Sequence, residues 1–303
     1  MSELISDIPG STPAGEIFDR GYRHYEGPRE GRAHAIRALI VYSLKRGLGI
    51  KKRWTAKIIP ILLYIAAFLP VIVIVGIRAL VSQIPQVAQS FGYGTLFSAL
   101  STILLIFAAA TAPEMLADDR RQNVLPLYFS RPISRADYVL AKVGALGILM
   151  GTISLVPPLL LFVADTLLAA SPASYLLHHL GLLLRILATG SLLALYFAAI
   201  GLVISSFTDR KAVAAAVYIG AMLVLSGIAA ALFQTVGADF RDYVALIDPV
   251  AVPLGLAGWI IGFNPGHATL SGSSLGGGWF LVDLLVISAL AAGVLYRRYL
   301  RHA

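Results

Sequence analysis

The stretch EMLADDRRQNVLPLYFSRPISRADY, residues 114–138, decides the fold of this chain because of the sequence on either side of it. It carries eight formal charges and separates the apolar runs 93–112 and 139–163. A helix needs about 20 predominantly apolar residues to cross the hydrocarbon core of a bilayer, and both runs reach that length. We therefore expect residues 114–138 to lie in water between two membrane-spanning helices.

The composition of the whole chain also indicates a membrane protein. Of its 303 residues, 58% are hydrophobic and 13% are charged, whereas a soluble domain carries about 25% charged residues. The absence of cysteine excludes disulfides, thiolate metal sites and a cysteine nucleophile. The net charge of +8 is not arranged as a basic stripe interleaved with aromatic residues, so we expect no nucleic-acid partner.

Six segments are long and apolar enough to span a bilayer. They are residues 58–77, 93–112, 139–163, 180–205, 212–233 and 279–296. With six spans, 21 of the 24 Lys and Arg residues fall on one side, in residues 1–57, 114–142, 206–211 and 297–303. Cytoplasmic segments carry the excess of Lys and Arg. We therefore expect a multi-pass protein of the cytoplasmic (inner) membrane, with the lipid bilayer as a partner and both termini in the cytoplasm.

The segment before the first span divides into two parts. Residues 1–30 are rich in Gly, Pro and charge, which predicts an irregular cytoplasmic segment. Residues 31–57 are expected to form an amphipathic helix with Ile36, Leu39 and Leu44 near one face. Basic residues around an apolar stripe suit a helix in the membrane interface, and a helix packed on the protein is the alternative. The first part of the sequence contains no apolar region, so we expect no signal peptide. We expect residues 58–303 to form the six-span domain.

Residues 238–278, before the last span, do not read as an ordinary loop. Residues 243–263 are strongly apolar, but Asp248-Pro249, Pro253 and Gly255 interrupt them. A seventh span here would move the last Arg residues of the chain to the wrong side. We therefore predict a re-entrant pair of short helices on the outer side, whose backbone must be buried in protein at that depth. The expected fold is an all-α integral membrane protein with six spans, the N-terminal amphipathic helix and this re-entrant hairpin.

Catalytic motifs are missing from the sequence. It contains no phosphate-binding loop, no Gly-x-Ser-x-Gly and no His-Glu-x-x-His, and we expect no metal site. Charges near spans are the usual functional indicators in membrane proteins, and Arg185 would pair with either Asp165 or Asp283. No acidic residue falls at mid-membrane, which argues against an ion-coupled transporter. The possible polar sites on the outer side are Asp165, Arg185, Asp248 and Asp283.

The charged stretch resembles the permease (membrane) subunits of ABC transporters, in particular the six-span type 2 exporter class. In that family the second span ends in a Glu, followed by a charged cluster, a Gly-Thr-Leu-like strip and a Pro-containing Arg motif before a Lys. Asn123-Val124 stands here in place of the usual Gly-Thr. Ser134 and Asp137 also predict a capping box at the start of the third span. The matching residues are Glu114, Asp118 to Arg121, Leu125, Arg131 to Arg135 and Lys142.

The resemblance implies a homodimer, or a heterodimer with a similar permease, bound to two separate ABC-type ATPase subunits. The chain itself is then not an enzyme and holds no cofactor, because ATP and Mg belong to the partner. The 114–138 loop is expected to dock on the ATPase as a coupling element, with a second, smaller contact at Asp209 and Arg210. The expected docking residues are Glu114, Asp118, Asp119, Arg120, Arg121, Arg131, Pro132 and Arg135.

Two other functions fit parts of the sequence. In a membrane anchoring or assembly protein without transport activity, the spans would only hold the basic N-terminal segment at the membrane. That function predicts that removal of residues 1–30 abolishes activity, whereas charge reversal at Asp118 and Asp119 does not. An intramembrane enzyme is the third hypothesis, and no motif supports it.

Overall fold

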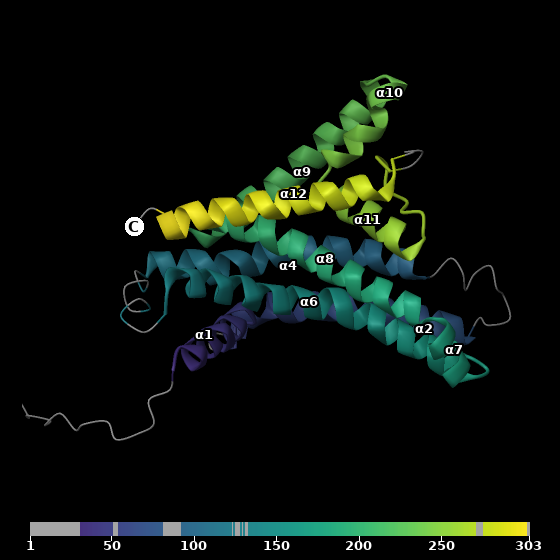
Figure 1. The fold of residues 1–303 in the computed structure, drawn as a ribbon, viewed down its shortest axis with the longest axis horizontal. Helices are drawn as coiled ribbons and strands as arrows, with labels where there is room; N and C mark the ends of the chain where they lie inside the picture. Colours follow the sequence, from purple (N-terminus) through teal and green to yellow (C-terminus); the bar gives the residue numbers. More distant parts are fainter. Residues whose placement is uncertain are drawn as a thin grey trace, which may run out of the picture. The chain divides into compact units, whose positions relative to one another are not determined.

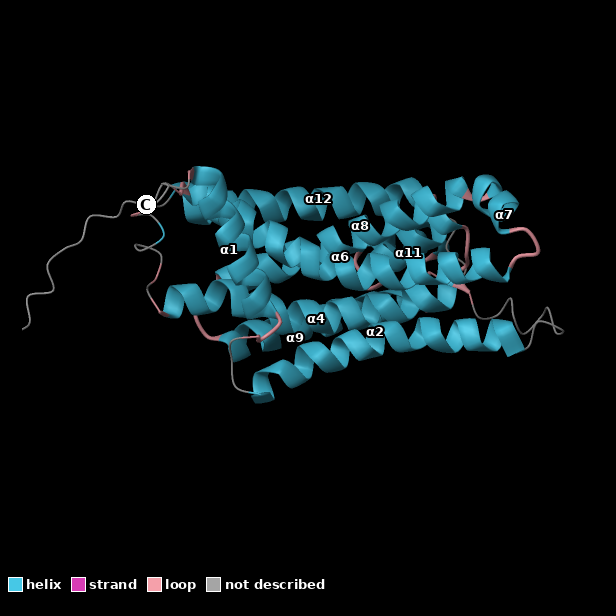
Figure 2. Cartoon of the chain, turned by 90° about the horizontal axis from the view of Figure 1, so that it is seen from below, coloured by secondary structure: helices cyan, strands magenta, loops and turns pink. Residues whose placement is uncertain are grey.

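The structure is a computed structural model that describes residues 31–50, 54–80, 92–122, 124, 128, 130, 133–270 and 275–301. The expectations for residues 1–30, Arg131 and Pro132 lie outside the described residues, as does the side chain of Asp118. Within the described ranges every regular element is helical. Figures 1 and 2 show the arrangement of these helices.

Among the described residues, six helices have the length and apolarity to cross a membrane, which confirms the six predicted spans. Each helix extends beyond the apolar core of its predicted span at one or both ends. They are α2 (Trp54–Leu80), α4 (Tyr93–Arg121), α6 (Arg135–Leu168), α8 (Leu180–Ser206), α9 (Lys211–Thr235) and α12 (Gly277–Tyr296).

Helices α4, α6 and α8 form the centre of the bundle and bury about half or more of their most apolar windows. Small residues allow these helices to approach closely, as is common between helices in lipid. A Cβ atom added to Gly190 of α8 would lie 2.8 Å from the carbonyl oxygen of Ser154 in α6. One added to Gly201 would lie 3.0 Å from Cβ of Ala112 in α4. Gly190 therefore leaves no room for a side chain, and Gly201 lies in tight contact with α4.

The N-terminal helix α1 (Arg32–Gly47) is shorter than expected and packs on the protein. Just after α1, Gly49 adopts a left-handed conformation, with φ 69°, and its N–H donates to the carbonyl of Arg46 at 3.0 Å. Leu39 is buried, and the apolar stripe around it packs against the same core as α4 and α6. The apolar stripe of α1 therefore packs on the protein itself, which was the alternative to a helix lying in the membrane interface.

The region before the last span holds short helices, as predicted, and none of its described helices is long enough to be a seventh span. These are α10 (Ala238–Arg241), the 3₁₀ helix η1 (Asp242–Leu246) and α11 (Ala251–Ile261). Eight consecutive residues of α11 are buried, from Ala251 to Gly258, and α11 packs against α12, α8 and α4. A further short helix, α7 (Pro172–His178), follows α6 and was not predicted.

The charged stretch begins inside a long helix. Helix α4 extends beyond the predicted span 93–112 and continues without interruption through Arg121. Nothing between Glu114 and Arg121 stops a helix, because the first proline of the stretch is Pro126. The next long helix, α6, begins at Arg135. The positions that remain for a separate coupling element are therefore residues 122–134.

Candidate functional site at the charged end of the bundle

The end of α4 and the starts of α6 and α9 meet at one end of the bundle, beside α1, and carry several ion-paired residues. We call this the charged end. It flanks residues 122–134 on both sides, through Arg121 of α4 and Arg135 of α6. Residues 122–134 are therefore joined along the chain to α4 on one side and to α6 on the other.

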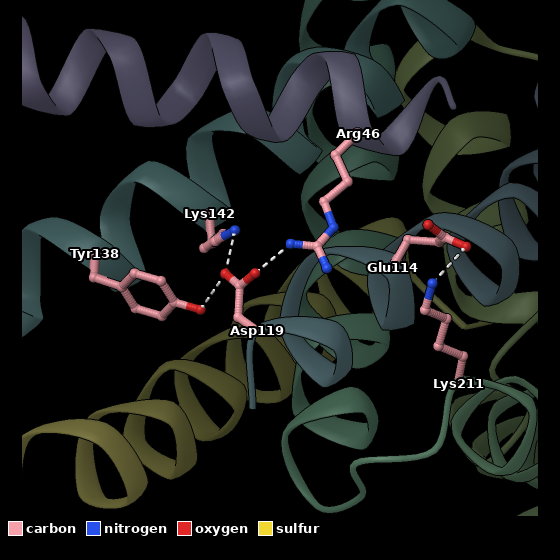
Figure 3. Close-up of polar contacts among 6 residues, drawn as sticks. All are labelled: Arg46, Glu114, Asp119, Tyr138, Lys142 and Lys211. Atoms are coloured by element: carbon pink, nitrogen blue, oxygen red, sulfur yellow. Dashed lines mark hydrogen bonds and ion pairs between the residues drawn. The ribbon is translucent and has the colours of Figure 1, made fainter. Parts of the chain in front are cut away.

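Asp119 is the centre of a buried polar cluster (Figure 3). Its side chain is 0% exposed, and one carboxylate oxygen forms an ion pair with Arg46 of α1. The other oxygen lies 2.7 Å from Nζ of Lys142 and accepts a hydrogen bond from the Tyr138 hydroxyl at 2.9 Å, both on α6. We call Arg46, Asp119, Tyr138 and Lys142 the Asp119 cluster. It joins α1, α4 and α6.

The Asp119 cluster is sensitive to the loss of any one member. Removing one partner of a buried ion pair costs roughly 3–5 kcal/mol, because a charge is left in a medium of low dielectric. The Lys142 side chain is 1% exposed and that of Arg46 is 7% exposed, so water cannot easily replace the carboxylate. The three helices are therefore fixed together where the charged stretch begins and ends.

A second ion pair fixes the other end of α1 to the start of α6. Arg32 donates two hydrogen bonds to Asp137, at 2.8 and 2.9 Å, and this carboxylate raises the pKa of the Arg32 guanidinium. Asp137 also accepts from the backbone N–H of Ser134 at 2.9 Å, while the Ser134 hydroxyl accepts from the N–H of Asp137 at 3.2 Å. The predicted capping box of α6 is confirmed.

A third set of contacts joins α4 to the connection between α8 and α9. Glu114 lies 3.2 Å from Nζ of Lys211, the first residue of α9. Arg120 lies 3.1 Å from Asp209 and also donates to the backbone carbonyl of Ser206. Asp209, which was expected to contact a partner, therefore already has a partner in the chain, and Arg210 beside it is exposed.

The expected docking residues fall into different environments. Arg121 is exposed and Arg135 is half-buried, so both can reach another protein. Glu114 and Arg120 are partly exposed and make the internal pairs described above. Asp119 requires a correction: its side chain is fully buried, so it is a positioning residue inside the chain and not a surface contact.

Sequence reasoning did not assign roles to Arg46 or Tyr138, and it did not pair Lys211 with Glu114. Arg46 lies 73 residues before Asp119 and Lys211 lies 97 residues after Glu114. No short-range spacing connects residues so far apart. The one available signal was the position of Arg46 near the apolar stripe of α1, which on a helix packed against protein buries a charge and calls for an acidic partner.

The polar residues at the opposite end require a further correction. Asp165 forms its ion pair with Arg78 at the end of α2, and its other oxygen accepts from the Tyr93 hydroxyl at 3.3 Å. Arg185 is exposed, and in the described ranges no ion pair joins it to Asp165 or to Asp283. Arg78 was the missed partner, 87 residues away.

Asp248 precedes α11 in the chain and is buried. Both of its carboxylate oxygens accept hydrogen bonds from neighbouring groups. It accepts hydrogen bonds from Ser226 of α9 at 2.6 Å, from the N–H of Val250 at 3.0 Å and from Thr269 at 3.1 Å. His267 lies 3.6 Å from its second oxygen. These contacts fix the short helices to α9. The structure also brings no three His, Asp or Glu side chains together as a metal site within its described part.

Comparison with known proteins places these features in one family. A family model described as ABC-2 family transporter protein matches residues 65–245. The match runs from within α2 to η1 and includes the whole charged stretch and the Glu114–Lys211 pair. No curated protein matches the chain.

Proposed function

The chain belongs to the ABC-2 transporter family, and we propose that it works as the membrane subunit of an ATP-driven exporter. It is a multi-pass membrane permease with six span-capable helices. In the proposed complex a separate ABC-type ATPase subunit binds ATP and Mg, and this chain converts its closure into movement of the spans. The chain itself has no catalytic role.

The Asp119 cluster is the observation that supports this function most directly. A coupling element must transmit a displacement to the spans, and flexible contacts would absorb that displacement. Residues 122–134 follow α4 and precede α6, and Asp119 ties these two helices to each other and to α1 through buried charged contacts. A push on either side of the stretch therefore moves three helices as one body.

The proposed docking surface lies between the end of α4 and the start of α6. Arg121 and Arg135 are its exposed or half-exposed cations, and Asp118, Arg131 and Pro132 complete it from the sequence. The excess of Lys and Arg at this end favours a cytoplasmic location, where an ATPase subunit is available. Asp209 and Arg210 would make the second, smaller contact.

The proposed complex contains two permease chains, either two copies of this one or one copy with a homologous permease. The most apolar windows of α9 and α12 are each only 22% buried within the chain. Part of that surface can contact lipid, and part is available to the second permease. The proposed dimer brings two docking surfaces together for two ATPase subunits.

Co-purification of the chain with its ATPase subunit tests the proposal. The double variant Arg121→Glu and Arg135→Glu reverses the charge of the docking surface and should abolish co-purification of the ATPase. The control Arg185→Glu reverses an exposed charge at the opposite end and should leave co-purification unchanged. Full activity without any ATP-binding subunit would contradict the proposal, and loss of activity only on removal of residues 1–30 would favour an anchoring or assembly protein.

A further inference from the structure

A cavity of about 630 Å³ lies at the end of the bundle opposite the Asp119 cluster. Arg78, Tyr93 and Ser98 line it from α2 and α4, and Phe263 and Asn264 line it from the chain that follows α11. Pockets that bind small molecules are about 300–1,000 Å³ in volume. The space is therefore suited to a small molecule or to one polar head group.

Two glycines shape this cavity. Gly262 ends α11 in a left-handed conformation, with φ 91°, and so turns the chain toward α4. A Cβ atom added to Gly94 of α4 would lie 2.9 Å from the ring of Phe263. The absence of a side chain at Gly94 therefore lets Phe263 lie directly against α4. The cavity is bounded by backbone at this contact and is not a loose gap between side chains.

The charge of Arg78 on the polar wall of the cavity is balanced by Asp165. Asp165 pairs with Arg78 and accepts the hydrogen bond from Tyr93 at 3.3 Å, so it neutralises and orients two side chains that line the space. The Ser98 hydroxyl donates to the carbonyl of Gly94 at 2.9 Å, which leaves its oxygen lone pairs as acceptors. Asn264 adds an amide, which both donates and accepts.

Another part of the wall is apolar, although Thr95 also lines the cavity. Leu182 of α8, Ile261 of α11 and Phe263 line it. An apolar ligand would fit this side but would form no hydrogen bonds with Ser98 or Asn264 on the opposite side. A ligand with a net charge would find no unbalanced countercharge in the Arg78–Asp165 pair.

We propose that this cavity binds an uncharged, hydroxyl-rich group, that is, a sugar or glycerol moiety. Each alcohol group both donates and accepts a hydrogen bond, which matches a wall of mixed donors and acceptors, and the C–H faces of such a ligand match the apolar wall. The ligand is either a free saccharide or the head group of a glycolipid. Binding here does not depend on ATP or on the ATPase subunit.

The test uses the full chain in lipid nanodiscs without the ATPase subunit. One arm measures D-glucose binding by saturation-transfer NMR, and the other measures retention of monoglucosyl diacylglycerol, against phosphatidylcholine alone, by native mass spectrometry. Ser98→Leu fills the cavity and should weaken binding at least tenfold. Ser98→Ala keeps the space, loses one acceptor and should weaken binding about two- to tenfold. Thr235→Leu, on the exposed end of α9, should bind like the wild type.

Binding in the glucose arm identifies a soluble saccharide as the ligand, and binding only in the lipid arm identifies a glycolipid head group. The proposal is overturned if neither probe binds, or if Ser98→Leu and Asn264→Leu both bind like the wild type. If Ser98→Leu does not elute as a folded protein, Asn264→Leu replaces it in the test. Asn264 is exposed, so its substitution should not disturb folding. Failure here leaves the proposed coupling to the ATPase intact, since co-purification tests it separately.

Discussion

Arg46 and Asp119 lie 73 residues apart and form an ion pair whose side chains are 7% and 0% exposed. The pair joins the N-terminal helix to the end of the second span, and Lys142 approaches the same carboxylate from α6 at 2.7 Å. A buried pair is weak support for stability in itself, since well-packed apolar residues often do as well. The effect of this pair is to fix the positions of α1, α4 and α6 relative to one another, because one carboxylate contacts side chains from the other two helices.

Asp119→Ala should lower the free energy of unfolding by roughly 3–5 kcal/mol, because it removes the carboxylate that two buried cations share. Denaturant unfolding in detergent measures the change. Arg121→Ala, two residues further along α4 and exposed, should change stability by no more than about 0.5 kcal/mol. Equal losses in the two variants would show that Asp119 has no special role in the packing of these helices.

Tyr138→Phe isolates one hydrogen bond of the Asp119 cluster. The hydroxyl donates to Asp119 at 2.9 Å, and hydrogen bonds to charged groups contribute roughly 1.5–3 kcal/mol. We expect a loss near the lower value, because Lys142 still contacts the same oxygen. In the Asp119→Ala background the same substitution should have almost no effect. Additive losses in this double-mutant cycle would mean that Tyr138 acts through packing alone.

The sequence predicts what depends on local pattern. The six spans follow from runs of apolar residues, and the capping box at Ser134 and Asp137 follows from a spacing of three. Even the short helices before the last span could be predicted, because Pro249 and Pro253 interrupt an apolar run that is otherwise long enough to cross the bilayer. Each of these features lies within one segment of the chain.

Contacts between segments could not be predicted in the same way. Asp165 and Asp283 were the two alternative partners considered for Arg185, yet Asp165 pairs with Arg78. The choice depends on which way each helix faces about its own axis, and apolar runs of nearly uniform hydrophobicity do not specify that. Asp119 was assigned to the surface for the same reason, because charge alone does not reveal that α1 covers it.

Gly190→Ala should destabilise the protein although alanine favours helices. The added Cβ would lie 2.8 Å from the carbonyl oxygen of Ser154, so α6 and α8 must separate, and overpacking of this kind costs typically about 1–3 kcal/mol. Gly220→Ala on α9 is the matched control, because nothing lies within 4 Å of its added Cβ. That control should be neutral or stabilise by up to about 1 kcal/mol. Unfolding midpoints in detergent distinguish the two, and a stabilising Gly190→Ala would contradict this helix contact.

Thr269→Val tests the buried contacts of Asp248. Valine keeps the shape of threonine and removes the hydroxyl that donates to Asp248 at 3.1 Å. A buried acceptor that loses its donor costs roughly 1–3 kcal/mol, and Thr269 itself is 1% exposed. Thermal unfolding should register this loss. Thr235→Val, on the exposed end of α9, makes the same chemical change without removing a hydrogen bond to Asp248. A comparable loss of stability in Thr235→Val would refute the role of the Thr269 hydroxyl.

The Glu114–Lys211 pair connects α4 to the first residue of α9, and charge exchange tests whether this contact is part of the coupling route. Lys211→Glu places two carboxylates where an ion pair of 3.2 Å now lies, so α9 should separate from α4 and transport driven by the ATPase should fall. The pair is about one quarter exposed on each side, so stability should change by only about 1 kcal/mol. The double variant Glu114→Lys and Lys211→Glu restores opposite charges and should recover most of the transport. If the double variant is as inactive as Lys211→Glu while ATPase co-purification is unchanged, the contact does not transmit motion.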